Sequence, residues 1–299
     1  MAEPSLYRLR PFKEIDMSKS KPPSESEALA AAPPVACLVD GDVGGVGKSV
    51  MAILIAMCFA LVEAPLKIYE LDEQGKLRRF LGPEVESLHA ARLDADTDGE
   101  RDLLPVFAPF HDALTSMSQT QQSVLLEVGG ALTELMNSFV AEVDVDDDIM
   151  ALGLAVIVFL LVVATEESIG QVVGQIGRLR QIMPSARIVI VLNERDGCPK
   201  VASADMPEKL AKDFAKALAT YPSIRMPRLR PKSRRMLETL GASPATVIAW
   251  RRDHFAEAMK RTKRPLAESK RFVNDVAAWT GDIHAELSRI MPFLGGRHE

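Results

Sequence analysis

The sequence has few of the residues that build disulfide frameworks or metal cages. Its 299 residues include three cysteines, Cys37, Cys58 and Cys198, which lie far apart and form no CxxC pair. This usage is typical of a reducing compartment, and we expect a cytoplasmic protein whose cysteines are small core residues. The five histidines form no HxxH, HExxH or mixed His/Cys cluster, which argues against a dedicated cage of such ligands.

Targeting signals and membrane spans are also lacking. The first residues, MAEPSLYRLRPFKEID, do not have the charged-then-apolar order of a signal peptide. One charge-free stretch, 149–165, is short for a bilayer span and has acidic residues on both sides, so we expect a buried core segment and no stable membrane insertion. Apolar residues make up 47% and charged residues 26%, which excludes collagen-like chains, wholesale disorder and disulfide scaffolds.

Charge is unevenly distributed along the chain. The net charge is −5, yet residues 225–271 carry 14 Lys and Arg against 4 Asp and Glu, a net charge of +10. Within this region, 225–235 (RMPRLRPKSRR) holds six cations in eleven residues. Such an asymmetry favours a polyanion-facing surface near the C-terminus; the alternative is a solvated helix face that pairs with the acidic remainder of the chain.

Short apolar runs alternate with helical patterns along the middle of the chain. The runs predict buried strands at 35–40, 66–71, 123–128, 154–163 and 187–192. Helical patterns lie between them, at 48–62, 132–143, 168–183 and 207–220. Continuous Val, Ile and Leu strands separated by helices predict an α/β fold, with a mostly parallel sheet and helices on both faces.

The chain ends are different from this middle part. Residues 1–33 are rich in proline and serine and predict a flexible tail. After Tyr221 only helices are expected, so the predicted organisation is an α/β domain at 34–230 and a basic helical extension at 231–299 packed on the same domain.

A glycine-rich loop follows the first predicted strand and leads directly into an apolar helix. The segment 42–49 reads DVGGVGKS. A loop of this kind lets backbone N–H groups converge on phosphate oxygens at a helix N-terminus, where the helix dipole also favours negative charge. In such a loop Lys48 reaches the β- and γ-phosphates and the Ser49 hydroxyl binds Mg²⁺.

The loop resembles the deviant Walker A motif, KGGxGK[ST], of the ParA/MinD family of P-loop ATPases. The match runs from Gly44 to Ser49, while Val43 stands where the family has its signature lysine, which reaches across an ATP-sandwich dimer. The resemblance implies a P-loop NTPase fold, ATP and Mg²⁺ as ligands, and a nucleotide-dependent homodimer. It assigns nucleotide contacts to the loop residues Val43, Gly44, Gly45, Val46, Gly47, Lys48, Ser49 and Val50.

Two acidic segments extend the resemblance. The stretch 70–77 (ELDEQGKL) is similar to the DxDPQGNL stretch of ParA-type ATPases, which implies that Asp72 positions the attacking water near the metal, with Glu70 in the first acidic position. The stretch 124–132 (VLLEVGGAL) is similar to the family's second acidic strand. There Glu127 takes the place of an aspartate that holds Mg²⁺, so the implied metal residues are Ser49, Asp72 and Glu127, and the implied catalytic residues are Lys48 and Asp72.

The residues expected to contact the nucleobase are compatible with either ATP or GTP. By resemblance, Asn193 at the end of the strand IVIVLN contacts the base, and Pro227 lines the base pocket as a loop after the last strand does in related folds. The same segment also spells NxxD, with Asn193 and Asp196 at the spacing by which GTPases read guanine. We favour ATP because the other motifs are of the ParA type, and keep GTP as the alternative.

Together the motifs predict a cytoplasmic, Mg²⁺-dependent ATP-binding and ATP-hydrolysing switch. Similarity to the plasmid StbB/TraL type implies a role in plasmid partition, stability or conjugative transfer, with a plasmid-encoded partner protein. Non-specific DNA binding through the Lys and Arg of 225–271 is the expected output. Because Val43 replaces the signature lysine, a nucleotide-sensing scaffold with little hydrolysis is the second possibility.

Overall fold

The computed structural model describes residues 33–41, 43–89, 102–200 and 206–295. Its strands are β1 (Val35–Asp40), β2 (Leu66–Leu71), β3 (Val85–Ser87), β4 (Ser123–Val128), β5 (Ala155–Val162), β6 (Arg187–Asn193) and β7 (Ser223–Met226). Its α-helices are α1 (Lys48–Leu61), α2 (Lys76–Leu81), α3 (Leu104–Thr115), α4 (Met117–Thr120), α5 (Thr133–Glu142), α6 (Val145–Leu152), α7 (Glu166–Ile182), α8 (Glu208–Thr220), α9 (Pro231–Leu240), α10 (Pro244–Ile248), α11 (Arg252–Thr262) and α12 (Leu266–Ile290). Three short 3-10 turns are η4 (Gly130–Leu132), η5 (Glu194–Asp196) and η6 (Pro292–Gly295).

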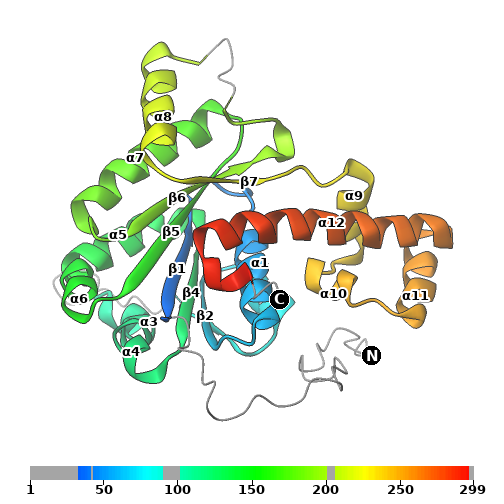
Figure 1. Cartoon of the computed structure of the whole chain (residues 1–299), viewed down its shortest axis with the longest axis horizontal. Coiled ribbons are helices and arrows are strands. Elements are labelled where there is room, and N and C mark those ends of the chain that lie inside the picture. The colour runs from blue at the N-terminus through cyan, green and yellow to red at the C-terminus, as the bar shows by residue number, and fades with distance from the viewer. Residues whose placement is uncertain (1–32, 42, 90–101, 201–205, 296–299) are drawn as a thin grey trace.

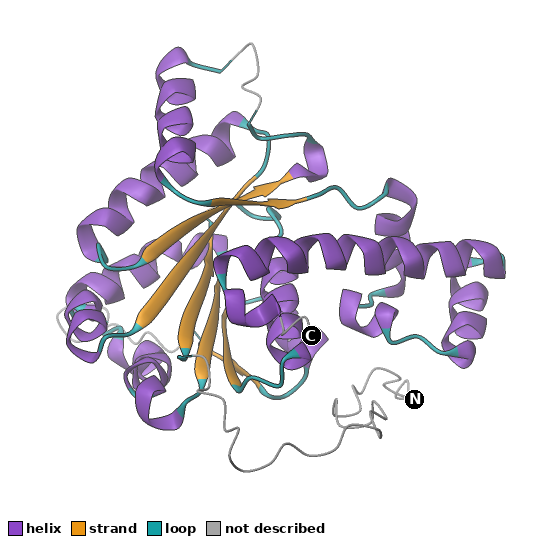
Figure 2. Cartoon of the chain, viewed as in Figure 1, coloured by secondary structure: helices purple, strands orange, loops and turns teal. Residues whose placement is uncertain are grey.

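The seven strands form one sheet in the order β3-β2-β4-β1-β5-β6-β7, and every pairing is parallel. Figure 2 shows the sheet with helices on both sides. The predicted α/β fold with a parallel sheet is therefore confirmed, and the glycine-rich loop joins β1 to α1 as in a P-loop NTPase. From β1 the chain builds β2, β3 and β4 on one side and then crosses to β5 on the other. Such a switch point leaves a crevice at the carboxyl ends of the strands, and the loop after β1 lies there.

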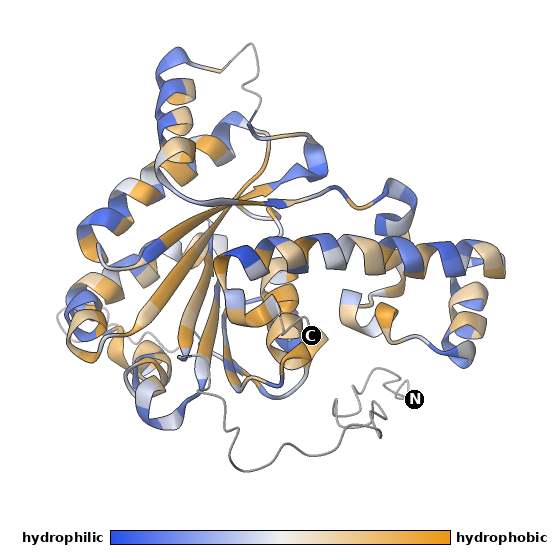
Figure 3. Cartoon of the chain, viewed as in Figure 1, coloured by the Kyte–Doolittle hydropathy of each residue, from blue (hydrophilic) through white to orange (hydrophobic). Residues whose placement is uncertain are grey.

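Side chains alternate along each strand, and this alternation divides the core into two layers. On one face, β1 residues such as Cys37 and Val39 pack with α1, with α12 and with the apolar sides of α9–α11. On the other face, Ala36 and Leu38 pack with α3, α5, α6, α7 and α8. The strands are mostly apolar, apart from charged residues such as Glu70 in β2 and Glu127 in β4, whereas many helices carry hydrophilic residues on one side (Figure 3). This pattern is expected for strands covered on both faces.

The C-terminal helices lie on the α1 face. Figure 1 shows α12 running past α1 and β7 toward α11, with α9 and α10 beside it. Phe272, Val276 and Ile283 of α12 are almost fully buried in the same core layer as α1. The predicted tail, 1–33, falls almost entirely outside the described residues.

All five predicted strands and all four predicted helices are present, with ends within two residues of those predicted. The prediction did not include the short strand β3 or the twelve-residue helix α3. The expectation of helices alone after Tyr221 is wrong, because β7 adds an edge strand in which Ile224 and Met226 are buried and Arg225 is exposed. This alternation marks a strand, but the density of cations in the segment obscures it.

The charge-free stretch 149–165 is divided between two elements. It includes the end of α6, which stops at Gly153 with φ 61°, and all of β5, which is buried in the middle of the sheet. In the described part of the chain, no helix is both long and apolar enough to cross a membrane.

Two of the three cysteines occupy the core as expected. Cys37 and Cys58 are buried, and burial raises the pKa of both thiols, that of Cys58 to about 12. Cys198 is exposed, so the expectation that all three are core residues is wrong at that position.

Candidate functional site

The loop between β1 and α1 has a backbone that requires glycine. Gly45 and Gly47 adopt positive φ values of 78° and 101°, and Gly47 precedes the first residue of α1. A Cβ on Gly47 would lie 2.8 Å from Asn193 Nδ2 and 2.9 Å from Met226 Cε, whereas a Cβ on Gly44 would meet nothing within 4 Å. The first turn of α1 has no side-chain cap on its N–H groups. The N–H groups of this first turn therefore have no side-chain acceptor, and the amides at a helix N-terminus favour an anion.

Lys48 spans the base of this loop. Its side chain is 7% exposed, and Nζ donates to the carbonyl oxygens of Gly41 at 2.5 Å and Val43 at 3.1 Å. A buried ammonium group needs such oxygen partners, because the protein interior stabilises it far less than water does. The Lys48 ammonium group is therefore held against the first residues of the loop, next to the backbone that would surround a phosphate.

Ser49 and Glu127, both expected at the metal, lie in contact with each other. The Ser49 hydroxyl donates to Glu127 Oε1 at 2.5 Å, and Glu127 is 1% exposed. Burial raises the pKa of Glu127 to about 7; Ser49 and Lys48 lower it, and the carboxylates of Glu70 and Asp72 raise it. Its other oxygen, Oε2, is buried without a hydrogen-bond partner in the structure.

This donor set suits Mg²⁺. A hydroxyl and a carboxylate, with one carboxylate oxygen unsatisfied, are the hard oxygen ligands that Mg²⁺ takes alongside substrate phosphates. A buried and unpartnered carboxylate oxygen is costly, and a cation beside it would remove that cost. Among the described residues no group of three or more His, Cys, Asp or Glu could hold a metal by itself, so the phosphates would have to complete such a site.

The two acidic residues at the end of β2, Glu70 inside the strand and Asp72 just after it, have different positions. Glu70 is fully buried and accepts from the backbone N–H groups of Leu77 at 2.5 Å and Arg78 at 3.2 Å, so it fixes the start of α2. Asp72 is half-buried and accepts from Gln74 N at 3.1 Å. Its Oδ1 would lie 3.5 Å from a Cβ on Gly129, which places Asp72 beside the segment that follows Glu127.

The two residues expected to contact the nucleobase, Asn193 and Pro227, lie on the side of the phosphate loop away from Glu127. Asn193 is buried, and its amide donates to the carbonyl of Val46 at 2.7 Å, so it supports the phosphate loop directly. Pro227 is half-buried, and its carbonyl accepts from the indole N–H of Trp279 at 2.7 Å, which joins the loop after β7 to α12. Of the remaining loop residues, Val46 is buried, and Val43 and Val50 are partly buried against the core layer of α1.

Sequence reasoning missed a buried network at the start of the loop. Asp40, the last residue of β1, accepts from Gly41 N at 2.7 Å, from Thr133 Oγ1 at 2.7 Å and from Gln175 Nε2 at 2.9 Å. Asn137 and Gln175 exchange two further hydrogen bonds. The network ties the base of the phosphate loop to α5 and α7. The sequence signal that could have indicated this network is Asp40 itself, a carboxylate at the end of an otherwise apolar strand.

The cations of the C-terminal region are partly paired. Arg225 makes two hydrogen bonds to Glu194, at 2.8 and 3.0 Å, and Arg230 pairs with Asp275 at 2.9 Å. Arg234 of α9 is exposed and pairs with Glu238 at 2.9 Å. Further exposed cations on α9 and the segment before it are Arg228, Lys232 and Arg235. Both readings of the sequence thus apply, since some cations pair within the chain and others face solvent.

No family model and no curated protein matches this sequence. Among solved structures, the chain is similar to a plasmid partition protein from Borrelia burgdorferi at 13% identity, over 67% of this chain and 92% of that one, with a TM-score of 0.37. It is also similar to a structure described as a plasmid partition protein of Borrelia burgdorferi B31 bound to AMPPNP, at 12% identity, over 79% of this chain and 99% of that one, with a TM-score of 0.39. Both TM-scores are below 0.5, so we base the function on the contacts of the site itself.

Proposed function

We propose that this protein is a Mg²⁺-dependent nucleoside triphosphate-binding switch, with ATP as its nucleotide. The observation that carries the proposal is the Ser49–Glu127 contact next to Lys48, with one carboxylate oxygen left unsatisfied. A lysine held by loop carbonyls and a hydroxyl–carboxylate pair at the start of α1 suit a triphosphate with its metal, and a structural turn needs neither of them.

Hydrolysis would be in-line attack of water on the γ-phosphate. Lys48 and the loop amides would stabilise the charge that develops on the phosphate oxygens. Asp72, which lies beside Gly129, would orient the attacking water. Ser49 and Glu127, with Asp72 nearby, would hold Mg²⁺, which neutralises phosphate charge when bound.

The output of the switch would be a change in affinity for DNA, a second copy of the chain and a partner protein. The exposed cations around α9 support non-specific contact with DNA phosphates. Together with the ParA/MinD resemblance of the loop, this favours a role in plasmid partition, stability or conjugative transfer. The loop after β7 connects the sheet to the C-terminal helices, because the indole N–H of Trp279 in α12 donates to the carbonyl of Pro227.

The test is calorimetric binding and turnover of ATP and GTP with Mg²⁺, with and without duplex DNA. We expect ATP binding that Lys48→Ala weakens by at least about 100-fold, because removing the cation leaves buried carbonyls and phosphate charge without a partner. Lys67→Ala is the matched control, since Lys67 of β2 pairs with Glu86 of the edge strand β3 and both side chains are partly exposed. Absence of any nucleotide binding by the native protein would contradict the proposal.

A nucleotide-sensing scaffold is the second candidate, and Val43 favours it. The signature lysine is missing from the loop, and the Val43 carbonyl is bound by Lys48 of the same chain. If the absent lysine limits turnover, Val43→Lys should raise it without changing ATP affinity greatly. An unchanged rate would mean that another group does this work or that none is needed.

A further inference from the structure

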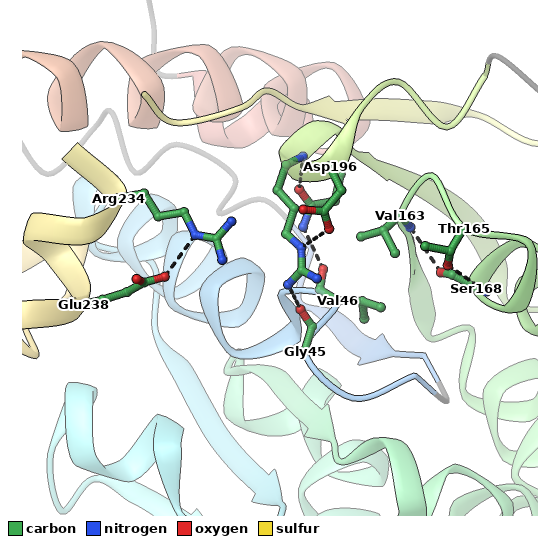
Figure 4. Close-up of polar contacts among 10 residues, drawn as sticks. Gly45, Val46, Val163, Thr165, Ser168, Asp196, Arg234 and Glu238 are labelled. Atoms are coloured by element: carbon green, nitrogen blue, oxygen red, sulfur yellow. Dashed lines mark hydrogen bonds and ion pairs between the residues drawn. The ribbon is translucent and has the colours of Figure 1, made fainter. Parts of the chain in front are cut away.

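The segment that follows β6 contacts the phosphate loop through more than the predicted asparagine. Asn193 binds the Val46 carbonyl, and its Oδ1 accepts from Arg195 N at 3.1 Å, which forms the single turn η5. From this turn the Arg195 side chain reaches back, and Nη1 donates to the carbonyl of Gly45. Figure 4 shows the carbonyls of Gly45 and Val46 facing the segment that contains Asp196.

The Arg195 guanidinium is held at two of its nitrogens. Nη1 binds Gly45, and Nε donates to Asp196 Oδ2 at 2.5 Å. Two anchors on different nitrogens fix the plane of a guanidinium group as well as its position. The side chain as a whole is nevertheless 35% exposed, so Arg195 is not sealed in the core.

The order of the strands indicates which part of a bound nucleotide would lie next to the Arg195 guanidinium. Ser49, Glu127 and Asp72 mark the metal end, and they lie toward β4 and β2. Arg195 follows β6, which is on the opposite side of β1 in the sheet. A triphosphate with its terminal phosphates at Lys48 and Ser49 therefore extends its nucleoside toward β6.

We propose that the fixed Arg195 guanidinium is the stacking platform for the nucleobase, a role that rests on the proposed nucleotide-binding function. A planar, weakly hydrated cation stacks on an aromatic ring and reads no hydrogen-bonding edge, so it accepts any purine. Asp196 is the anchor of this platform. Its Oδ2 is taken by Arg195 Nε, so the carboxylate does not have both oxygens free for the two hydrogen bonds by which it would select guanine.

The experiment compares ADP, AMPPNP, GDP and inorganic tripolyphosphate by calorimetry, on the full chain with Mg²⁺. Arg195→Ala should weaken ADP, AMPPNP and GDP by a similar factor, about tenfold, which is the range for loss of one stacked base. Binding of tripolyphosphate, which has no base, should stay within about twofold; this also shows that the variant is folded. Arg195→Lys keeps the charge without the plane and should remain weakened.

The matched control is Arg289→Ala, which removes an exposed arginine paired with Glu286 near the end of α12. Equal loss of tripolyphosphate and ADP affinity in Arg195→Ala would place the guanidinium on phosphate and overturn the proposal, as would full rescue by lysine. Loss of GDP alone in Asp196→Asn would show that the carboxylate reads guanine, with the same consequence.

Failure of this inference is distinguishable from failure of the proposed function. A native protein that binds neither ADP nor tripolyphosphate contradicts the function itself. A native protein that binds both, with Arg195→Ala unchanged for every ligand, contradicts the platform alone.

Discussion

The phosphate-loop edge of the sheet and the C-terminal helices α9–α12 use charge in opposite ways. At the loop, Lys48 and Glu127 are buried, and each meets specific oxygen or hydroxyl partners. At the C-terminal helices the arginines lie on the surface, as in the pairs Arg230–Asp275 and Arg234–Glu238, although Asp275 itself is mostly covered.

The difference decides how sensitive each region is to substitution. A buried charge depends on its particular partners, since desolvation is costly and only those partners offset it. An exposed ion pair contributes about 0–1 kcal/mol and can be exchanged for another. The extension should therefore be fixed by its apolar side and remain variable on its charged side, whereas the loop should tolerate almost no change.

The largest expected effect comes from the apolar side of the extension. Ile283 of α12 is fully buried in the layer shared with α1, so Ile283→Ala should lower the free energy of unfolding by about 2–5 kcal/mol. Chemical denaturation followed by fluorescence and by circular dichroism should show one transition for the whole chain. Asn274→Ala, at an exposed position of α12, is the control. Two separate transitions would show that helices α9–α12 unfold independently of the sheet, and would contradict the view that their apolar side is fixed in the same core as α1.

The loop itself gives the next effect. Gly47→Ala forces a positive φ on alanine and brings its Cβ to 2.8 Å from Asn193 Nδ2, so we expect a loss of about 2 kcal/mol in the nucleotide-free protein. Gly44→Ala, which has open space and no positive φ, should cost less than about 0.5 kcal/mol of stability. Thermal unfolding without nucleotide separates the two; equal destabilisation would mean that the loop is not held as described.

The third effect is pH dependence at Glu127. Burial raises the pKa of Glu127 to about 7, while in the unfolded chain it has the ordinary value near 4.5. Between these values the folded protein holds a proton that the unfolded chain has released, so raising the pH favours unfolding. From pH 6 to pH 8 without Mg²⁺ this group should remove about 1.4 kcal/mol of stability.

Glu127→Gln supplies the comparison for that prediction. The variant cannot ionise at this position, so the stability difference between variant and native protein should grow in favour of the variant from pH 6 to pH 8. Urea denaturation at three pH values measures it. A pH-independent difference would show that Glu127 is already ionised at pH 6, and that burial does not raise its pKa to about 7.

Local sequence patterns were enough to predict most of the fold. Strands such as 35–40 and 187–192 are continuous apolar runs because both faces of the sheet are covered, and the glycine-rich loop is marked by its own residues. The short strand β7 was missed because its four residues lie among cations. Arg195 was missed for a different reason: its contact with Gly45 joins residues 150 apart and depends on how β6 is placed beside β1, which no local pattern records.

The smallest effect concerns the exposed cations. Arg228, Lys232 and Arg235 are exposed around the start of α9. Replacing all three by serine should weaken binding of the ATP-loaded protein to random-sequence duplex DNA by about tenfold at low salt. The slope of log affinity against log salt should fall by up to about 0.9 for each cation that contacts a phosphate.

The control for that variant carries the same change in charge at another place. Lys209, Lys212 and Lys216 are exposed on α8, which packs on the opposite face of the sheet from α9. Serine at these three positions lowers the net charge equally, so an effect of charge alone would weaken DNA binding to the same extent. A loss confined to the α9 variant, with unchanged thermal stability, would locate the DNA contact on the C-terminal helices and support the division between fixed apolar and variable charged sides. Equal losses in both variants would reduce the C-terminal cations to ordinary surface charge.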